Sequence, residues 1–198
     1  MITDLHFFTK LTYSFTRVLT MPKKTSVKLA AESFMGDAIQ VLAFFTDTAA
    51  LKEAHATWCA DYSILRLYLE FETLMLKTLI GAINNDTDTL SQSSGFSFPK
   101  HLSQDVCTYL VIGNGYFDFK GRDGLIKTIK RFVPKGHYLL DVVRDHKYKD
   151  ALEQLIALRN FAAHRSRQAK KKAAEATGAE RIGSSGAPSV CGRLPNPE

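Results

Sequence analysis

The chain has 198 residues, of which 45% are hydrophobic and 23% are charged. It is long enough to bury one ordinary core and too apolar for a disordered chain. No apolar run approaches the ~18–20 residues of a transmembrane helix, and the start MITD lacks the positive region of a secretory signal. The three cysteines, Cys59, Cys107 and Cys191, give no metal-ligand spacing and favour a reducing compartment. We therefore expect a cytoplasmic protein without a membrane segment.

The net charge of +6 is unevenly distributed along the chain. From Arg165 onward there are seven basic and three acidic residues, a net charge of +4, which leaves +2 for the first 164 residues. Such a segment suits a nucleic-acid partner, because neutralisation of phosphates drives sequence-independent binding. The same charge is also typical of a solvated basic tail, and both interpretations stay open.

Residues 1–25 carry apolar side chains that can share one face of a helix. These side chains are Phe7, Phe8, Leu11, Phe15, Val18 and Leu19. The stretch Met21-Pro22-Lys23-Lys24 that follows also resembles the start of a chain. We expect residues 1–25 to be either a leader, added upstream of the domain, or an accessory helix packed on it.

Two long helices are predicted next, from about Ser26 to Phe45 and from about Ala54 to Ile83. Ser26 is a good N-cap residue. The predicted core face of the first helix consists of Leu29, Phe34, Ile39, Leu42 and Phe45. In the second helix, positions 65, 69, 72, 76, 79 and 83 step by four, three, four, three and four, which is the spacing of a coiled-coil seam. We expect this helix to be central in a bundle, with Trp58 and Tyr62 making core or dimer contacts.

The rest of the chain predicts shorter helices. Turn-forming residues make 84–99 a loop, and helices are expected over about 106–112, 125–133, 138–144 and from 149 into the 170s. The last ~20 residues are rich in Gly, Ser and Pro and are expected to be disordered. Strand patterns are weak throughout, so the predicted class is all-α, with one domain over 26–175 and a tail over 176–198.

The last long helix carries a polar cluster in an apolar context. Leu152, Leu155, Arg159 and Ala162 are spaced by three, four and three, so Arg159 occupies a position where the pattern calls for an apolar residue. Asn160 and His164 are neighbours on the helix surface at i and i+4.

The directions of the two ionisable side chains limit what one helix can do. Arg159 and His164 point about 140° apart on an ideal helix, so one helix alone makes a poor two-residue site. Two copies that meet across a dimer axis would make a better one.

The second long helix has a matching irregularity. Glu72 lies within its apolar seam, and a carboxylate there is costly unless it is paired. We predict that Glu72 faces Arg159. The alternative is that Glu72 reaches the surface beside Glu70.

The run Arg159–His164 (RNFAAH) resembles the R-x4-H motif of HEPN domains, helical domains named for higher eukaryotes and prokaryotes nucleotide-binding. The resemblance covers about residues 26–175 and implies an all-α, four- to five-helix up-and-down bundle. Many HEPN proteins are metal-independent ribonucleases of toxin–antitoxin, phage-defence and CRISPR systems. The family often has a polar residue after the arginine, here Asn160, and an acidic residue on an earlier helix, which we carry over to Glu72.

The resemblance implies that the RNA 2′-hydroxyl attacks the neighbouring phosphate. His164 would be the general acid or base, Arg159 would stabilise the phosphate charge, and Asn160 would orient His164 or the phosphate. No metal or cofactor is expected. RNA, a second copy and possibly an antitoxin protein are the expected partners. The predicted RNA-binding residues are Arg165, Arg167, Lys170, Lys171 and Lys172.

Two other functions stay open. A HEPN-like module can bind RNA, a nucleotide or a protein partner without chemistry. A purely structural helical protein predicts that Arg159 and His164 lie far from any groove.

Overall fold

The computed structural model describes residues 26–179. This part of the chain contains eight α-helices and no β-strand, which confirms the all-α class, and none of these helices has the length and apolarity to span a membrane. The predictions for residues 1–25 and 180–198 lie outside the described residues. The helices are α2 (Val27–Thr48), α3 (Glu53–Asn85), α4 (Asp88–Ser94), α5 (Gln104–Ile112), α6 (Gly121–Ile129), α7 (Tyr138–Arg144), α8 (His146–His164) and α9 (Arg167–Thr177).

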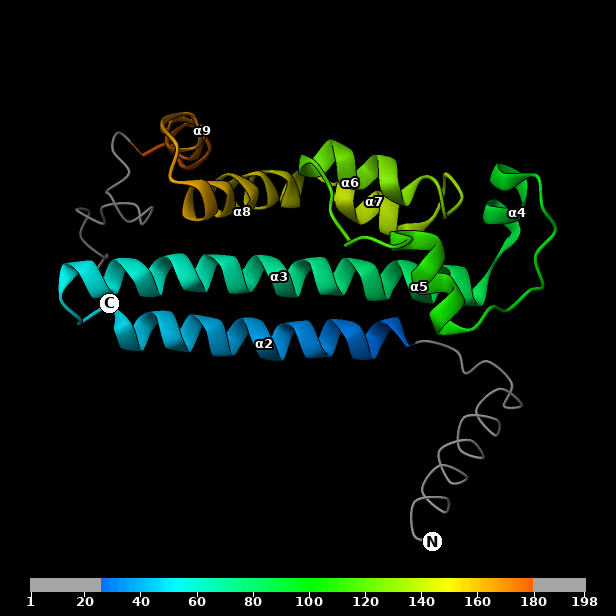
Figure 1. Ribbon diagram of the computed structural model, residues 1–198, viewed down its shortest axis with the longest axis horizontal. Coiled ribbons are helices and arrows are strands. Elements are labelled where there is room, and N and C mark those ends of the chain that lie inside the picture. The colour runs from blue at the N-terminus through cyan, green and yellow to red at the C-terminus, as the bar shows by residue number, and fades with distance from the viewer. Residues whose placement is uncertain (1–25, 180–198) are drawn as a thin grey trace, which may run out of the picture.

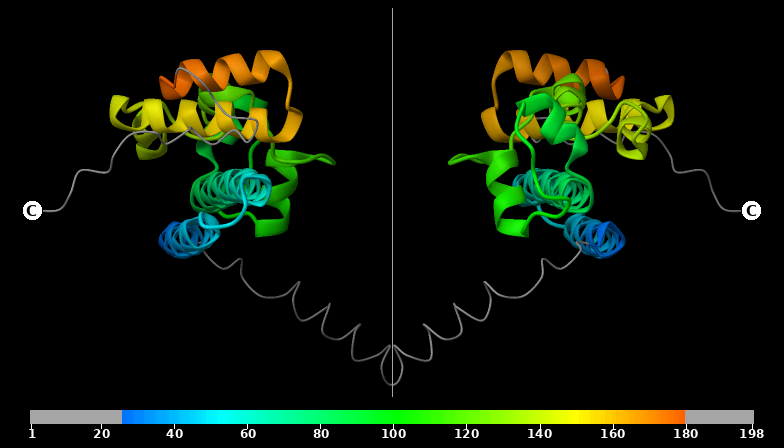
Figure 2. Two further views of the ribbon diagram at one scale, coloured as in Figure 1. Left: turned by 90° about the vertical axis from the view of Figure 1, so that its left-hand side faces the viewer. Right: turned by 90° about the vertical axis from the view of Figure 1, so that its right-hand side faces the viewer.

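The helix α3 lies between two others. It forms a long antiparallel hairpin with α2, while α8 lies along its other side (Figure 1). Seen end-on, α2 is at one edge of the molecule, and α8 and α9 are on the far side of α3 (Figure 2). In this arrangement α8 packs against the long helix α3. The finer prediction of a HEPN-like bundle of four or five helices stays a prediction.

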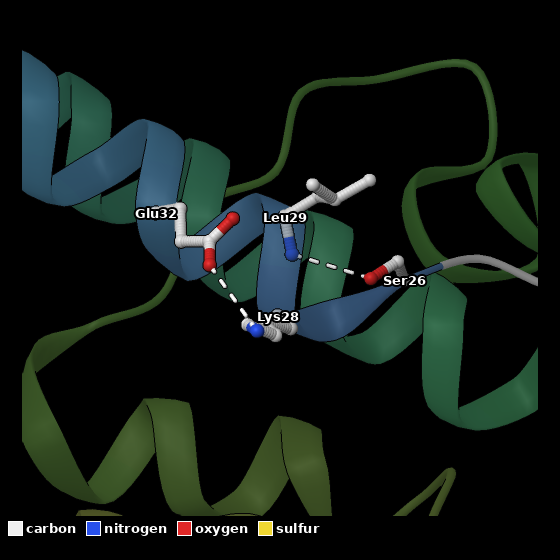
Figure 3. Close-up of polar contacts among 4 residues, drawn as sticks. All are labelled: Ser26, Lys28, Leu29 and Glu32. Carbon is white, nitrogen blue, oxygen red and sulfur yellow. Dashed lines mark hydrogen bonds and ion pairs between the residues drawn. The ribbon is translucent and has the colours of Figure 1, made fainter.

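The start of α2 follows the sequence prediction. Ser26 Oγ accepts a hydrogen bond from the backbone N–H of Leu29 at 3.3 Å, and Lys28 pairs with Glu32 at 3.7 Å one turn along (Figure 3). An N-cap of this kind satisfies one of the free N–H groups of the first turn.

The predicted core face of α2 was wrong for four of its residues. Leu29, Ile39, Leu42 and Phe45 keep 66%, 65%, 64% and 43% of their surface exposed. The reason is that α2 packs mainly on α3, so only one strip of the helix is covered. Phe34 lies on the covered side, where its ring centroid is 6.4 Å from that of Phe71.

The main core is formed by the C-terminal half of α3 and the helices that follow it. Its most deeply buried apolar side chains are Leu79, Ile83, Leu125, Ile129 and Leu140, with the thiol side chain of Cys107. These side chains come from α3, α5, α6 and α7, so the core joins α3 to the short helices that precede α8.

The region 84–99 is more ordered than the predicted loop. It contains α4, whose Leu90 is buried. The Asn84 side chain donates to the carbonyl of Leu102 at 2.6 Å, and the Thr87 hydroxyl donates to the carbonyl of Pro99 at 2.9 Å. These polar residues read as turn formers in the sequence, but here they tie the segment to the core.

The predicted helices near 106–112 and 138–144 are present at Gln104–Ile112 and Tyr138–Arg144. The predicted helix at 125–133 is displaced and spans Gly121–Ile129. Beyond it the chain tightens into turns in which the N–H of Phe132 donates to Ile129 at 3.0 Å. Pro134 therefore follows these turns and does not end the helix directly.

The predicted helix from 149 into the 170s is two helices, α8 and α9. Arg165 takes a left-handed conformation with φ 50°, which ends α8. Ser166 then caps α9, because its Oγ accepts from the N–H of Ala169 at 3.1 Å. The Arg165 side chain forms an ion pair with Asp61 of α3, a buried residue. Phe161 and Ala173 pack together, so α9 folds back on α8.

The ion pair between Asp61 and Arg165 should contribute measurably to stability. The substitution Asp61→Asn removes the charge from a buried group, and we expect it to lower the free energy of unfolding by about 1–3 kcal/mol. Urea unfolding monitored by circular dichroism measures the change. Asp150→Asn, at an exposed position of α8, is the control and should stay within about 0.5 kcal/mol of the parent. Equal losses in both variants would contradict the role of the pair.

Candidate active site

The three motif residues line one cleft in a single chain. The cleft has a volume of about 640 Å³ and is bounded by α8, α9, the 118–123 segment and Tyr68 of α3. Arg159, Asn160 and His164 all contribute to its wall. Both Arg159 and His164 reach the cleft despite the wide angle between them on the helix. A cleft of this size can hold a nucleotide-sized ligand.

The guanidinium group of Arg159 is held on two sides. Its central carbon lies 4.7 Å from the ring centroid of Tyr68, and its Nη1 donates to the Oδ1 of Asn160 at 3.1 Å. Asn160 therefore contacts the arginine in this structure, whereas the sequence predicted that it would orient His164 or the phosphate. The half-buried Arg159 still lines the cleft.

Glu72 lies near Arg159, with Tyr68 as the group that connects them. The Tyr68 hydroxyl hydrogen-bonds the Glu72 carboxylate, and the charge of Arg159 acts on both groups. Glu72 is half-buried, while its neighbour Glu70 pairs with Arg66 on the next face of α3. Glu72 and Arg159, the two charged residues that interrupt apolar stripes in the sequence, thus both lie close to Tyr68.

Burial dominates the electrostatics of this cluster. Burial raises the pKa of Glu72; the positive charge of Arg159 lowers it, Asp118 raises it, and the hydrogen bond from Tyr68 lowers it. Burial and the charge of Glu72 raise the pKa of Tyr68 to about 12. Tyr68 therefore keeps its proton at physiological pH and donates it in the hydrogen bond to Glu72.

The helix α9 supplies a wall of the cleft that the sequence did not reveal. Ser166, Gln168, Ala169 and Lys172 line the cleft, so the N-terminal turn of α9 borders it. The positive end of a helix dipole favours anions at this position.

The predicted RNA-binding residues separate into two groups. Among them only Lys172 lines the cleft. Arg165 is engaged with Asp61 and lies 5.3 Å from the ring of Phe161. Arg167 and Lys170 are exposed, and the exposed Lys171 pairs with Glu175 at 3.7 Å. The break before α9 therefore removes Arg165 from the basic strip that a single long helix would have presented, while Arg167, Lys170 and Lys171 remain exposed on α9.

The rest of the cleft lining has mixed charge. Lys120 and Arg122 contribute positive groups, Asp118 and Asp123 contribute carboxylates from the same segment, and Glu153 contributes one from α8. Arg122 also donates to the carbonyls of residues 143 and 144 at 2.9 and 2.7 Å, which ties α6 to the end of α7. The cleft therefore brings basic and acidic side chains together from both α8 and the 118–123 segment.

The sequence analysis missed Tyr68 because it considered only the apolar seam of α3, which contains leucines and Glu72. The available signal was the spacing, since Tyr68 lies four residues before Glu72 and therefore on the same helix face. Within residues 26–179, no cluster of three or more His, Cys, Asp or Glu side chains is arranged to hold a metal ion.

The raised pKa of Glu72 predicts a pH-dependent cost of folding. Because the folded pKa lies above the ordinary value of 4.5, the folded state binds the proton more tightly, and stability falls as pH rises through this window. We expect Glu72→Gln to raise the unfolding temperature by a few degrees at pH 7.5. The gain should disappear near pH 4, where the carboxyl is already protonated.

Thermal unfolding at both pH values measures this difference. Glu175→Gln, at an exposed position of α9, is the matched control and should show no comparable gain. A destabilised Glu72→Gln variant at pH 7.5 would show that attraction to Arg159 outweighs the cost of burial.

No family model, curated protein or solved structure matches the chain. The resemblance to HEPN domains therefore rests on the motif residues and their helical context. Any assignment of function is argued from the chemistry of the cleft itself.

Proposed function

We propose that the chain is a metal-independent endoribonuclease of a bacterial toxin or defence system. The observation that carries the proposal is the convergence of a guanidinium, an amide and an imidazole on one cleft, from Arg159, Asn160 and His164. This set of groups suits transfer at a phosphodiester, where charge develops on phosphate oxygens and protons move between hydroxyls.

In the proposed reaction the RNA 2′-oxygen forms a bond to phosphorus while the bond from phosphorus to the 5′-oxygen breaks. The products carry a 2′,3′-cyclic phosphate and a 5′-hydroxyl. His164 accepts the proton of the 2′-hydroxyl or protonates the leaving oxygen. Arg159 contacts the phosphate oxygens, as a guanidinium can do through two parallel hydrogen bonds. The first turn of α9 and Lys172 add favourable potential for the phosphate.

A second copy of the chain would complete this chemistry. Attacking and leaving oxygens lie on opposite sides of phosphorus in an in-line displacement, so one imidazole is poorly placed to serve both. A partner's His164 would supply the second proton-transfer group. This is the reason for proposing a composite site in a homodimer, even though one chain already brings its own motif residues together.

An exposed apolar seam on α3 suits that second copy. Trp58, Tyr62, Leu65 and Leu69 are 66%, 57%, 36% and 50% exposed and step by four, three and four, as in a coiled-coil seam. One end of the seam lies near the end of α8, because Trp58 and Arg165 line a common hollow. Exposed apolar patches of this kind mark interaction sites. An antitoxin protein is the other partner that a binding test would detect here.

The carboxylates of the cleft favour a second candidate function. Asp118, Asp123 and Glu153 line the cleft and would repel a long phosphate backbone, which suits a short ligand with a cationic or amino group. A non-catalytic HEPN-like module that binds a nucleotide, RNA or a protein partner would use the same cleft without cleavage.

Incubation with labelled single-stranded RNA tests the nuclease directly. We expect cleavage to persist in EDTA and to yield cyclic phosphate ends. His164→Ala should lower the rate by about 10²–10⁴-fold, because it removes the proton-transfer group. His146→Ala, at an exposed position at the start of α8, is the matched control and should cleave normally. RNA that is bound but never cleaved would favour the binding module instead.

Disruption of the seam tests the dimer. Leu69→Glu places a charge in the proposed interface, so we expect light scattering to report a monomer at concentrations where the parent is a dimer. Ile39→Glu, on the exposed face of α2, should leave the dimer intact. A parent protein that is monomeric at all concentrations, or a Leu69→Glu variant that stays dimeric, would refute this interface.

A further inference from the structure

We infer that Tyr68 is a positioning residue for the proposed reaction, and that its ring holds the Arg159 guanidinium in the orientation that meets the phosphate. This inference rests on the proposed ribonuclease function and adds a residue that the motif does not contain. It concerns a contact between α3 and α8, so it links the site to the central helix of the fold.

The ring of Tyr68 forms a platform on which the Arg159 guanidinium lies. The residue is 4% exposed, yet it lines the cleft, and the central carbon of the Arg159 guanidinium lies 4.7 Å from its ring centroid. A guanidinium over an aromatic face is attracted by the electron density of the ring. Stacking of this kind leaves the edges of the planar guanidinium for hydrogen bonds. One edge is used by Asn160, at 3.1 Å.

The platform is itself fixed by aromatic packing. The Tyr68 ring lies 5.9 Å from Phe119, which in turn lies 6.1 Å from Phe71 and 5.9 Å from Phe117. Phe119 is 4% exposed and belongs to the segment that forms the opposite wall of the cleft. Movement of Tyr68 would therefore disturb the buried ring of Phe119 and the half-buried rings that pack on it, which restrains the arginine in contact with Tyr68.

The hydroxyl of Tyr68 adds a second restraint. It hydrogen-bonds Glu72, and the high pKa of the tyrosine keeps the proton on the phenol oxygen. Donation of this hydrogen bond to a carboxylate increases the electron density of the ring, which strengthens its attraction for a cation. Glu72 thus acts on Arg159 through the ring as well as through its own charge.

A comparison of three variants tests the inference on single-stranded RNA. Tyr68→Met fills the space without a ring, and we expect kcat to fall about tenfold to thirtyfold with KM nearly unchanged, because Arg159 acts mainly on charge that develops in the transition state. Tyr68→Phe keeps the ring and should stay within about fivefold of the parent. Tyr109→Met, at an exposed tyrosine of α5, is the matched control.

A second readout does not require activity. In ¹⁵N-labelled protein, the Nε proton of Arg159 should be shifted upfield by the ring of Tyr68. The shift should be lost in Tyr68→Met and kept in Tyr68→Phe. Should Tyr68→Met fail to fold, the Arg159 signal of the parent protein still tests the contact, because a signal without the upfield ring shift would overturn the inference.

The outcomes distinguish a failure of the proposed ribonuclease function from a failure of the positioning role of Tyr68. A parent protein that cleaves no RNA overturns the proposed function, and the arginine signal then decides whether Tyr68 orients Arg159. An active parent with an equally active Tyr68→Met variant overturns the inference alone. An Arg159 signal that does not change when the ring is removed also overturns it.

Discussion

The cleft depends on a change of chain direction at Arg165. The left-handed backbone of Arg165, the cap from Ser166 and the ion pair with Asp61 of α3 all act at this point. If α8 continued straight, Lys172 would lie about 12 Å beyond His164 along the helix axis. The fold instead returns α9 against α8, so the first turn of α9 and Lys172 form a wall of the cleft. An ion pair with the buried Asp61 thereby helps to set the shape of the site.

The carboxylate of Glu72, next to the cleft residue Tyr68, opposes folding and supports the proposed chemistry. Burial raises the pKa of Glu72 even though Arg159 is close enough to lower it, so the ionised carboxylate costs stability at neutral pH. In return it accepts the hydrogen bond of Tyr68, whose ring supports Arg159. Functional sites commonly keep such destabilising groups. An apolar residue at position 72 would continue the seam of α3 and leave the tyrosine hydroxyl without this acceptor.

The sequence predicts much of this architecture because apolar residues recur along each helix with the helical period. The bounds of α7 and the N-cap of α2 follow from local signals, and Glu72 and Arg159 were identified because each interrupts an apolar stripe. The break at Arg165 was missed because Asp61, which pairs with it, is distant in the chain. The exposure of Leu29, Ile39 and Leu42 was missed for a related reason. Periodicity identifies an apolar face, but only packing shows which helix, if any, covers it.

The exposed seam and the chemistry of the cleft support each other. One imidazole cannot readily serve both sides of an in-line displacement, so the proposed reaction calls for a second histidine. The apolar seam of α3 ends at Trp58, beside Arg165, and its Leu69 adjoins Tyr68. A second copy seated on this seam would therefore lie next to both the motif and its aromatic platform. Since α3 carries both the seam and Tyr68, which lines the cleft, dimer formation and the orientation of Arg159 would be coupled through a single helix.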